Sequence, residues 1–301
     1  MSEYNLMQPM EIRPECQACL RRLVELTVAQ ATADQALQEQ ARQAALEIIA
    51  REFGPEAIPA GIANQFHHAI MAVTGNSDPF ATRKAAETAY LGRMFRKIAA
   101  TYGADLESLL QLAAVGNAID FFRDEAEVTR ELASRVEFGL SELNHFSRQL
   151  AGPPGLLLYL ADNAGEQFFD APLVGHLRRL GWRVRYVVKA GPIQNDLTRE
   201  DLEASGLGAA LGPVIDTGAR TVGLEMDRVS PAFLKLFEAA QFILAKGMGH
   251  FETLSHLADP RLYFLLQAKC VPVARALGVA RRSFVFCRTP AISLDTAEPT
   301  G

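Results

Sequence analysis

The apolar residues of this chain change their spacing near residues 152–155, Gly-Pro-Pro-Gly, and this change limits the folds open to it. Before that point they recur three and four positions apart, as on the buried face of an amphipathic helix. After it they gather in short continuous runs separated by helical segments, which is typical of buried parallel strands joined by helices. We therefore expect an all-helical subdomain without strands at residues 1–150. We expect an α/β domain with a Rossmann-like, mostly parallel sheet at residues 151–301.

Six apolar runs in the second half are predicted to be strands. They lie at residues 155–162, 182–191, 214–218, 241–247, 261–270 and 282–289. Most of the segments between them have helical spacing, so successive parallel strands would be joined by right-handed crossovers. With 49% hydrophobic residues, the 301-residue chain can bury a sizeable core around such a sheet.

The residues that follow each predicted strand are the first candidates for a functional site, because ligands bind beyond the carboxyl ends of the strands in open α/β sheets. Four loops in these positions combine carboxylates, amides, lysines and glycines. They contain Asp162, Asn163, Gly165 and Glu166; Lys189, Gly191, Asn195 and Asp196; Gly218 and Thr221; and Lys246, Gly247, Gly249, His250 and Glu252. Such a mixture suits a hard divalent cation beside a phosphate group.

Asp162, Asn163 and Asp196 are the predicted metal ligands, because Mg²⁺ and Mn²⁺ prefer carboxylate and amide oxygens. Lys189 and Lys246 are predicted to hold phosphate oxygens by charge, while the loop glycines let backbone amides approach an anion. Taken singly, each signal has a simpler reading, since Asp-Asn after a strand is often a turn or a helix cap. Their repetition after three separate strands favours a site.

Several segments also carry a family resemblance. In the second half they read LYLADNAGEQFFDAPLV, VVKAGPIQNDLT, VIDTG and ILAKGMGHFETL, and in the first half PECQACLRRL, TGNSDPFATRK and AAVGNAIDF. In this order and spacing they resemble the damage-control phosphatase family, long catalogued as domain of unknown function 89, and its prokaryotic cysteine-bearing branch. The resemblance runs from about Glu15 to Cys287.

The resemblance implies metal-dependent hydrolysis of small phosphometabolites, such as sugar phosphates or phosphorylated cofactor precursors, with Mn, Mg, Co or Ni as the ion. It implies that Asp162, Asn163 and Asp196 bind the metal and that Lys246 binds phosphate. Two positions depart from the family pattern: His250 stands where members commonly have Asn, and Phe80 where they commonly have Tyr.

The route of hydrolysis stays open at this stage. Asp162 or Asp196 could attack phosphorus to form an aspartyl-phosphate, or a metal-bound water could attack directly. Glu252 and His250 are the candidates for a general acid. Two rival functions use the same loops: methyl transfer from S-adenosylmethionine, and a non-catalytic protein that binds a metal or a phosphate ligand. The glycine-rich loop expected for the methyltransferase is not evident after the first strand.

Two motifs in the helical half could also contribute. Asn117 and Asp120 lie in an apolar segment, where a polar side chain faces either the cleft or a buried hydrogen-bond network. Cys16 and Cys19, with Cys270 as a third member, could form a second metal site or a redox pair. The alternative is two cysteines on one helical turn, packed in the core.

Charge and hydropathy exclude other classes of partner. With 30 basic and 35 acidic side chains the net charge is −5, which gives no electrostatic reason to expect nucleic acid. No apolar run reaches the ~18 residues that a membrane-spanning helix needs, and no signal peptide is visible. We therefore expect a cytoplasmic protein that acts on a small phosphate ester; the oligomeric state is left open.

Overall fold

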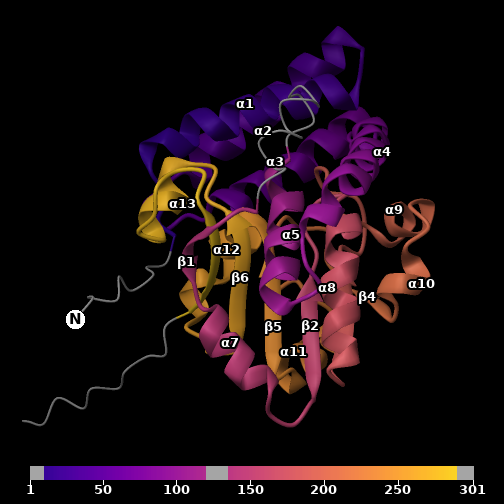
Figure 1. Ribbon diagram of the computed structural model, residues 1–301. Helices are drawn as coiled ribbons and strands as arrows, with labels where there is room; N and C mark the ends of the chain where they lie inside the picture. The colour runs from indigo at the N-terminus through magenta and orange to yellow at the C-terminus, as the bar shows by residue number, and fades with distance from the viewer. Residues whose placement is uncertain (1–9, 120–134, 290–301) are drawn as a thin grey trace, which may run out of the picture.

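The computed structural model describes residues 10–119 and 135–289, which form a helical layer above an α/β sheet (Figure 1). Within these residues the sheet has seven strands in the order β1-β7-β6-β5-β2-β3-β4. The strands are β1 Phe138–Ser141, β2 Leu156–Leu160, β3 Arg183–Val188, β4 Val214–Asp216, β5 Phe242–Lys246, β6 Leu262–Gln267 and β7 Phe284–Arg288. All neighbouring pairs are parallel except β6 and β7. The predicted α/β class with a mostly parallel sheet is confirmed.

The six strands predicted in the second half correspond to β2–β7, and the connecting segments are helical. The connecting helices are α8 Gln167–Arg179, α9 Arg199–Ala204, α10 Gly208–Leu211, α11 Pro231–Ala239, α12 Gly247–Leu254, the 3-10 turn η2 Ser255–Leu257 and α13 Val271–Ala276. The right-handed crossover rule places helices on both faces of such a sheet.

The central strands are buried along their whole length, which is why they read as continuous apolar runs. Because successive side chains of a strand point to opposite faces, Leu157 and Tyr159 of β2 pack with α5, α7 and α8. Leu156, Leu158 and Leu160 pack on the other face with α11, α12 and α13. These two helical layers cover the two faces of the sheet, and the loops lie at its carboxyl edge.

One strand comes from the half that was expected to contain only helices. β1 pairs in parallel with β7 at the edge of the sheet. The following helix, α7 Leu143–Leu150, sends Phe146 against Tyr263 and Phe286 of β6 and β7. The expectation of no strand in the first half is therefore wrong. A four-residue edge strand with alternating exposure is too short to show a period in the sequence.

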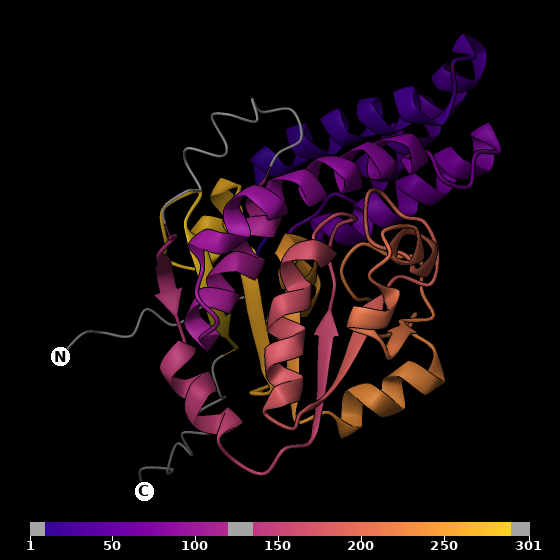
Figure 2. The ribbon, with the colours of Figure 1, turned by 45° about the vertical axis from the view of Figure 1, so that its right-hand side comes forward.

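Of the remaining helices, α5 packs on one face of the sheet and the others form the layer over the sheet edge. These remaining helices are α1 Pro14–Ala31, α2 Gln35–Glu52, α3 Pro59–Thr74, α4 Ala81–Ile98, the 3-10 turn η1 Ala99–Thr101 and α5 Leu106–Ala118. Asp34 begins α2 by accepting hydrogen bonds from the amides of Ala36 and Leu37. Figure 2 shows the arrow of β2 pointing toward this layer, so the helices cover the carboxyl edge of the sheet.

Polar contacts join the helical layer to the sheet domain. Asn64 of α3 donates to Glu225 at 2.8 Å, and the buried Lys84 of α4 pairs with Asp201 of α9 at 2.9 Å. The domain boundary between residues 150 and 151 stays a prediction, and α5 and α7 from the first half pack into the core of the sheet. No helix in residues 10–119 and 135–289 is long and apolar enough to cross a membrane.

Candidate functional site

The loops that follow β2 and β3 meet at the carboxyl edge of the sheet. Because these strands are parallel neighbours in register, their loops leave the same edge, and Asn163 and Asp196 form an isolated antiparallel bridge there. The amide of Leu197 donates to the carbonyl of Asp162 at 2.8 Å. The backbone therefore brings Asp162, Asn163 and Asp196 together, as the sequence predicts.

These three side chains line one cavity of about 240 Å³ beneath α1 and α3. Asp162 Oδ2 accepts from Asn163 Nδ2 at 2.8 Å and from Asn117 Nδ2 at 2.9 Å. Asp196 Oδ2 is buried without a hydrogen bond, and Lys189 Nζ lies 3.5 Å from it. The cavity thus contains two buried carboxylates that their protein partners satisfy only in part.

Burial is the main cause of a raised pKa at both aspartates. Burial and the neighbouring carboxylates of Glu166 and Asp196 hold the pKa of Asp162 well above its ordinary value. Burial raises the pKa of Asp196 to about 6, although Lys189 opposes the shift. Buried like charges are costly unless a proton or a cation neutralises them.

The donor set fits a hard divalent cation. Two carboxylates and one amide supply oxygens of the kind that Mg²⁺ and Mn²⁺ prefer, and the carboxylate oxygen without a hydrogen bond is available to such an ion. Across the described parts of the chain, no cluster of three or more His, Cys, Asp or Glu side chains is arranged to hold a metal. Asn163 is therefore essential to the predicted set, which otherwise has only two ligands.

Gly247, the first residue of α12, lies directly against Asp162. It has a positive φ of 81°, and a Cβ at this position would collide with the Asp162 carboxylate. Gly165 is similarly constrained, with a φ of 98° and its α-carbon packed against Leu91 and Thr88 of α4. These glycines are required for close approach to protein groups, whereas their predicted contact with a substrate anion stays a prediction.

Lys246 lies beneath the cavities and does not line either of them. Its side chain is completely buried, and its ammonium pairs with Asp170 Oδ1 at 2.6 Å and Glu166 Oε2 at 2.7 Å. Tyr159 and Tyr186 also donate to Asp170, at 2.8 and 2.7 Å. The lysine neutralises two buried carboxylates, and its predicted phosphate contact stays a prediction.

Lys189 is also turned inward. Its ammonium donates to the carbonyl of Gly223 at 2.5 Å and lies 3.2 Å from His250 Nε2. His250 Nδ1 donates to the carbonyl of Lys246 at 2.7 Å, which leaves Nε2 as an acceptor. Burial, together with the Lys189 charge, holds the pKa of His250 well below its ordinary value. His250 is therefore a neutral partner of Lys189, and Lys189 adjoins the predicted metal ligand Asp196.

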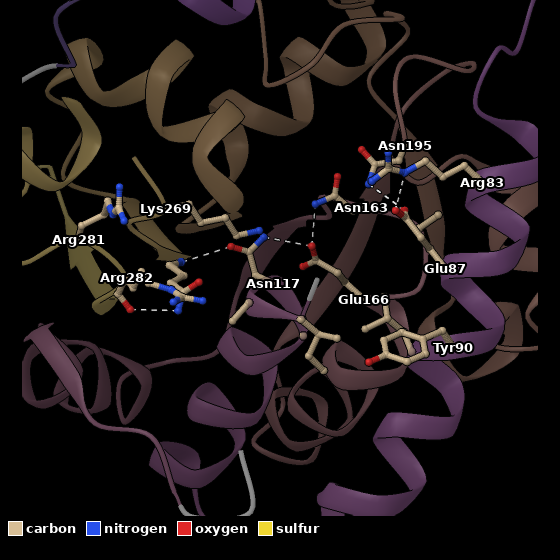
Figure 3. A pocket seen from close by; sticks show the side chains of 16 residues that line it. Arg83, Glu87, Tyr90, Asn117, Asn163, Glu166, Asn195, Lys269, Arg281 and Arg282 are labelled. Atoms are coloured by element: carbon tan, nitrogen blue, oxygen red, sulfur yellow. Dashed lines mark hydrogen bonds and ion pairs between the residues drawn. The ribbon is translucent and has the colours of Figure 1, made fainter. Parts of the chain in front are cut away.

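A second, larger cavity of about 510 Å³ adjoins the first (Figure 3). The two share Asn117, Asn163 and Lys269 among their lining residues. Besides Asn163, the predicted site residues Asn117, Glu166 and Asn195 line the larger cavity, and Gly249 and Glu252 line the smaller one. Gly191 packs against the Arg220 side chain. Asp120 lies outside the described residues.

Several polar residues of the larger cavity were missed by reasoning from the sequence. They are Arg83, Glu87, Tyr90, Gln267, Lys269, Arg281 and Arg282. Two signals could have identified part of this set. Lys269 follows β6, so the rule of inspecting each strand's carboxyl end applies to it. Arg83, Glu87 and Tyr90 are spaced four and three apart, which places them on one face of α4.

Glu252 is an acid on the smaller cavity with a raised pKa. Its Oε2 accepts from the amide of Ala60 at 3.1 Å, and burial raises its pKa to about 7. A carboxyl group with this pKa can gain or lose a proton near neutral pH. Its position on the smaller cavity is compatible with the predicted acid role, which stays a prediction.

The cysteines of the predicted second metal site lie near the smaller cavity. Cys19 lines it, Cys16 is buried at the start of α1, and Cys270 precedes α13. Burial raises the pKa of Cys16, and that of Cys270 to about 11. Metal ligation requires the thiolate, and the surroundings of Cys16 and Cys270 disfavour that form. A second metal stays a prediction.

Comparisons with known proteins find relatives over nearly the whole chain. The family model described as the damage-control phosphatase ARMT1-like domain matches residues 12–285. A damage-control phosphatase of Pyrococcus horikoshii is 36% identical, covering 93% of this chain and 98% of its own length. A damage-control phosphatase of Archaeoglobus fulgidus is 31% identical, with 90% and 96% covered. The crystal structure of a DUF89 family protein from Pyrococcus horikoshii aligns with a TM-score of 0.84 at 34% identity, covering 93% of this chain and 99% of that chain.

Proposed function

Because the chain belongs to the damage-control phosphatase family with the ARMT1-like domain, we propose that it is a metal-dependent phosphatase of small phosphometabolites. The observation that carries this proposal is the pairing of a buried carboxylate–amide cluster with a cationic cavity. Asp162, Asn163 and Asp196 form the cluster, and Lys269 borders both cavities. Phosphate esters of damaged or unwanted metabolites are the proposed substrates.

Asp162, Asn163 and Asp196 would hold the divalent ion, which when bound would polarise the phosphoryl group and stabilise charge on its oxygens. Lys269 would orient the phosphate from the junction of the two cavities. Lys246 would act indirectly: it keeps Glu166 ionised and in place, since the pKa of Glu166 is lowered by Lys246 even though burial opposes the shift. Glu252 would donate or accept the proton, because its pKa of about 7 permits both states.

The decisive experiment measures phosphate release from p-nitrophenyl phosphate and from a sugar phosphate, with Mn²⁺, with Mg²⁺ and with chelator. We expect turnover that a chelator abolishes and added metal restores. Asp162→Asn should remove the metal stimulation, because it replaces a charged ligand with a neutral one. Asp216→Asn is the matched control, since Asp216 is the last residue of the neighbouring strand β4 and lines neither cavity.

Two outcomes would overturn the proposal. A folded wild-type protein that releases no phosphate with any of these metals is not the proposed enzyme, and tight S-adenosylmethionine binding in that case would favour the methyltransferase. Asp162→Asn with full metal-stimulated turnover would show that Asp162 is not a ligand.

A further inference from the structure

One side of the larger cavity carries cations that form no salt bridge with the described part of the chain. Lys269, Arg281 and Arg282 lie on the connection from β6 to β7 and are exposed. No acid in residues 10–119 or 135–289 forms a salt bridge with any of the three. Unpaired cations that border a cavity are free to meet an anionic ligand.

The acids of the same cavity are already neutralised. Glu87 pairs with Arg83 at 2.7 Å and accepts from Asn195 at 3.0 Å. Glu166 pairs with Lys246 at 2.7 Å. Among the described residues that line the cavity, the cations outnumber the acids, and the excess comes from the β6–β7 connection.

The three cations are not equivalent in position. Lys269 borders both cavities, so it adjoins the predicted metal ligands, whereas Arg281 and Arg282 line only the larger cavity. Figure 3 shows Arg281 and Arg282 on one side of Asn117, and Glu87, Tyr90 and Asn195 on the other. Arg281 and Arg282 lie on the same side of Asn117 as Lys269, but of the three only Lys269 lines the smaller cavity that Asp162 and Asp196 also line.

The backbone of Arg282 is held in a conformation that arginine rarely adopts. Its φ is +73°, in the left-handed region that favours glycine. Its amide donates to the carbonyl of Ala268 at 2.7 Å, and its carbonyl accepts from Gln267 Nε2 at 3.0 Å. A strained backbone fixed by its surroundings often marks a functional position.

We propose that Arg281 and Arg282 bind a second anionic group of the substrate, remote from the phosphate that is hydrolysed. This inference rests on the proposed phosphatase function and narrows its substrate class to phosphometabolites that carry another phosphate or a carboxylate. Arginine suits both groups, because its planar fork donates two parallel hydrogen bonds to either. A cavity of about 510 Å³ is within the size range of small-molecule sites.

The test compares three substrates that differ at one end: glucose 6-phosphate, 6-phosphogluconate and glucose 1,6-bisphosphate. We expect a KM roughly tenfold or more lower for at least one of the two-anion compounds, as one charge-assisted contact would give. A preference for 6-phosphogluconate identifies a carboxylate as the second group, and a preference for the bisphosphate identifies a phosphate. Equal KM values for all three overturn the inference.

Arg282→Gly is the most informative variant, because it removes the guanidinium and also relieves the positive φ. Because glycine readily adopts this φ, a change in substrate preference in Arg282→Gly would not come from misfolding of the loop. Arg282→Gly and Arg281→Gln should each reduce the preference for the two-anion substrate roughly tenfold. Arg275→Gln is the matched control: Arg275 is exposed on α13, in the same connection, but lines neither cavity. A preference that survives both arginine variants overturns the inference.

Binding measurements separate this inference from the proposed function. Calorimetry in chelator compares the Kd values of the same three compounds. A preference for a second anion that depends on Arg281 and Arg282 supports the inference even if no phosphate is released. If hydrolysis in the arginine variants slows equally for all three substrates, the arginines only attract anions in general. That result overturns the inference and leaves the phosphatase proposal intact.

Discussion

Replacement of Lys246 by methionine tests whether this lysine supports the fold or holds substrate. Its ammonium lies between Asp170 and Glu166, at 2.6 and 2.7 Å, and its side chain is completely buried. Methionine keeps an unbranched chain of similar length but removes the charge. Two buried carboxylates would then lose their cation, while Asp170 would keep its hydrogen bonds from Tyr159 and Tyr186.

The expected cost is large. Removing one partner of a buried ion pair costs about 3–5 kcal/mol, because it leaves an uncompensated charge in the interior. With about 2 °C of melting temperature per kcal/mol for a chain of this size, Lys246→Met should melt about 6–10 °C below the wild type. Guanidinium denaturation of the metal-free protein should show the same loss in the free energy of unfolding.

Two further variants make the result interpretable. Lys235→Met changes an exposed lysine on α11 and should alter stability by no more than about 0.5 kcal/mol. Combining Lys246→Met with Asp170→Asn should recover part of the loss, because one fewer carboxylate is left without its cation. If Lys246→Met is as stable as Lys235→Met and yet loses phosphate release, Lys246 acts on the substrate and the structural role assigned to it is wrong.

Two other predictions follow from the glycine and the acid beside the cavity. We expect Mn²⁺ to raise the melting temperature of the wild type and Gly247→Ala to abolish that rise, because the alanine Cβ would displace the Asp162 carboxylate; an undiminished Mn²⁺ shift in the variant contradicts this. The pKa of Glu252 is about 7 when folded, against an ordinary 4.5, so the folded chain binds an extra proton between these values. The contribution of this proton to the free energy of unfolding has its full value below pH 4.5. It is lost as the pH rises through 7, and the loss amounts to up to about 3 kcal/mol. The free energy of unfolding of metal-free Glu252→Gln should lack this decline, and parallel pH profiles of the two proteins would refute it.

The fold was largely predictable because the buried strands of the second half have a strong local signature. β2 and β5 are buried at every position, are apolar apart from Lys246 at the end of β5, and lead into polar loops. β1 has no such signature, since its four residues gain their structure from β7, a partner far away in the chain. The absence of a local pattern therefore explains the one strand that was missed.

The candidate site was predictable at the backbone level and less so at the level of side chains. Asp162, Asn163 and Asp196 meet because parallel strands in register send their loops to one edge. The sequence alone does not show that Lys246 points inward to Asp170 while Lys269 borders the cavities, because both lysines lie at or just after the end of a strand. Only the packing around each ammonium distinguishes them.

The position of β1 at the sheet edge has a consequence for the order of folding during synthesis. Residues 138–141 leave the ribosome about 150 residues before β7, the strand they pair with, and domains generally fold as units as they emerge. The first half therefore cannot complete its structure while the chain is still growing. For the same reason, a fragment starting at residue 151 would present β7 as an open strand edge, which is a template for aggregation.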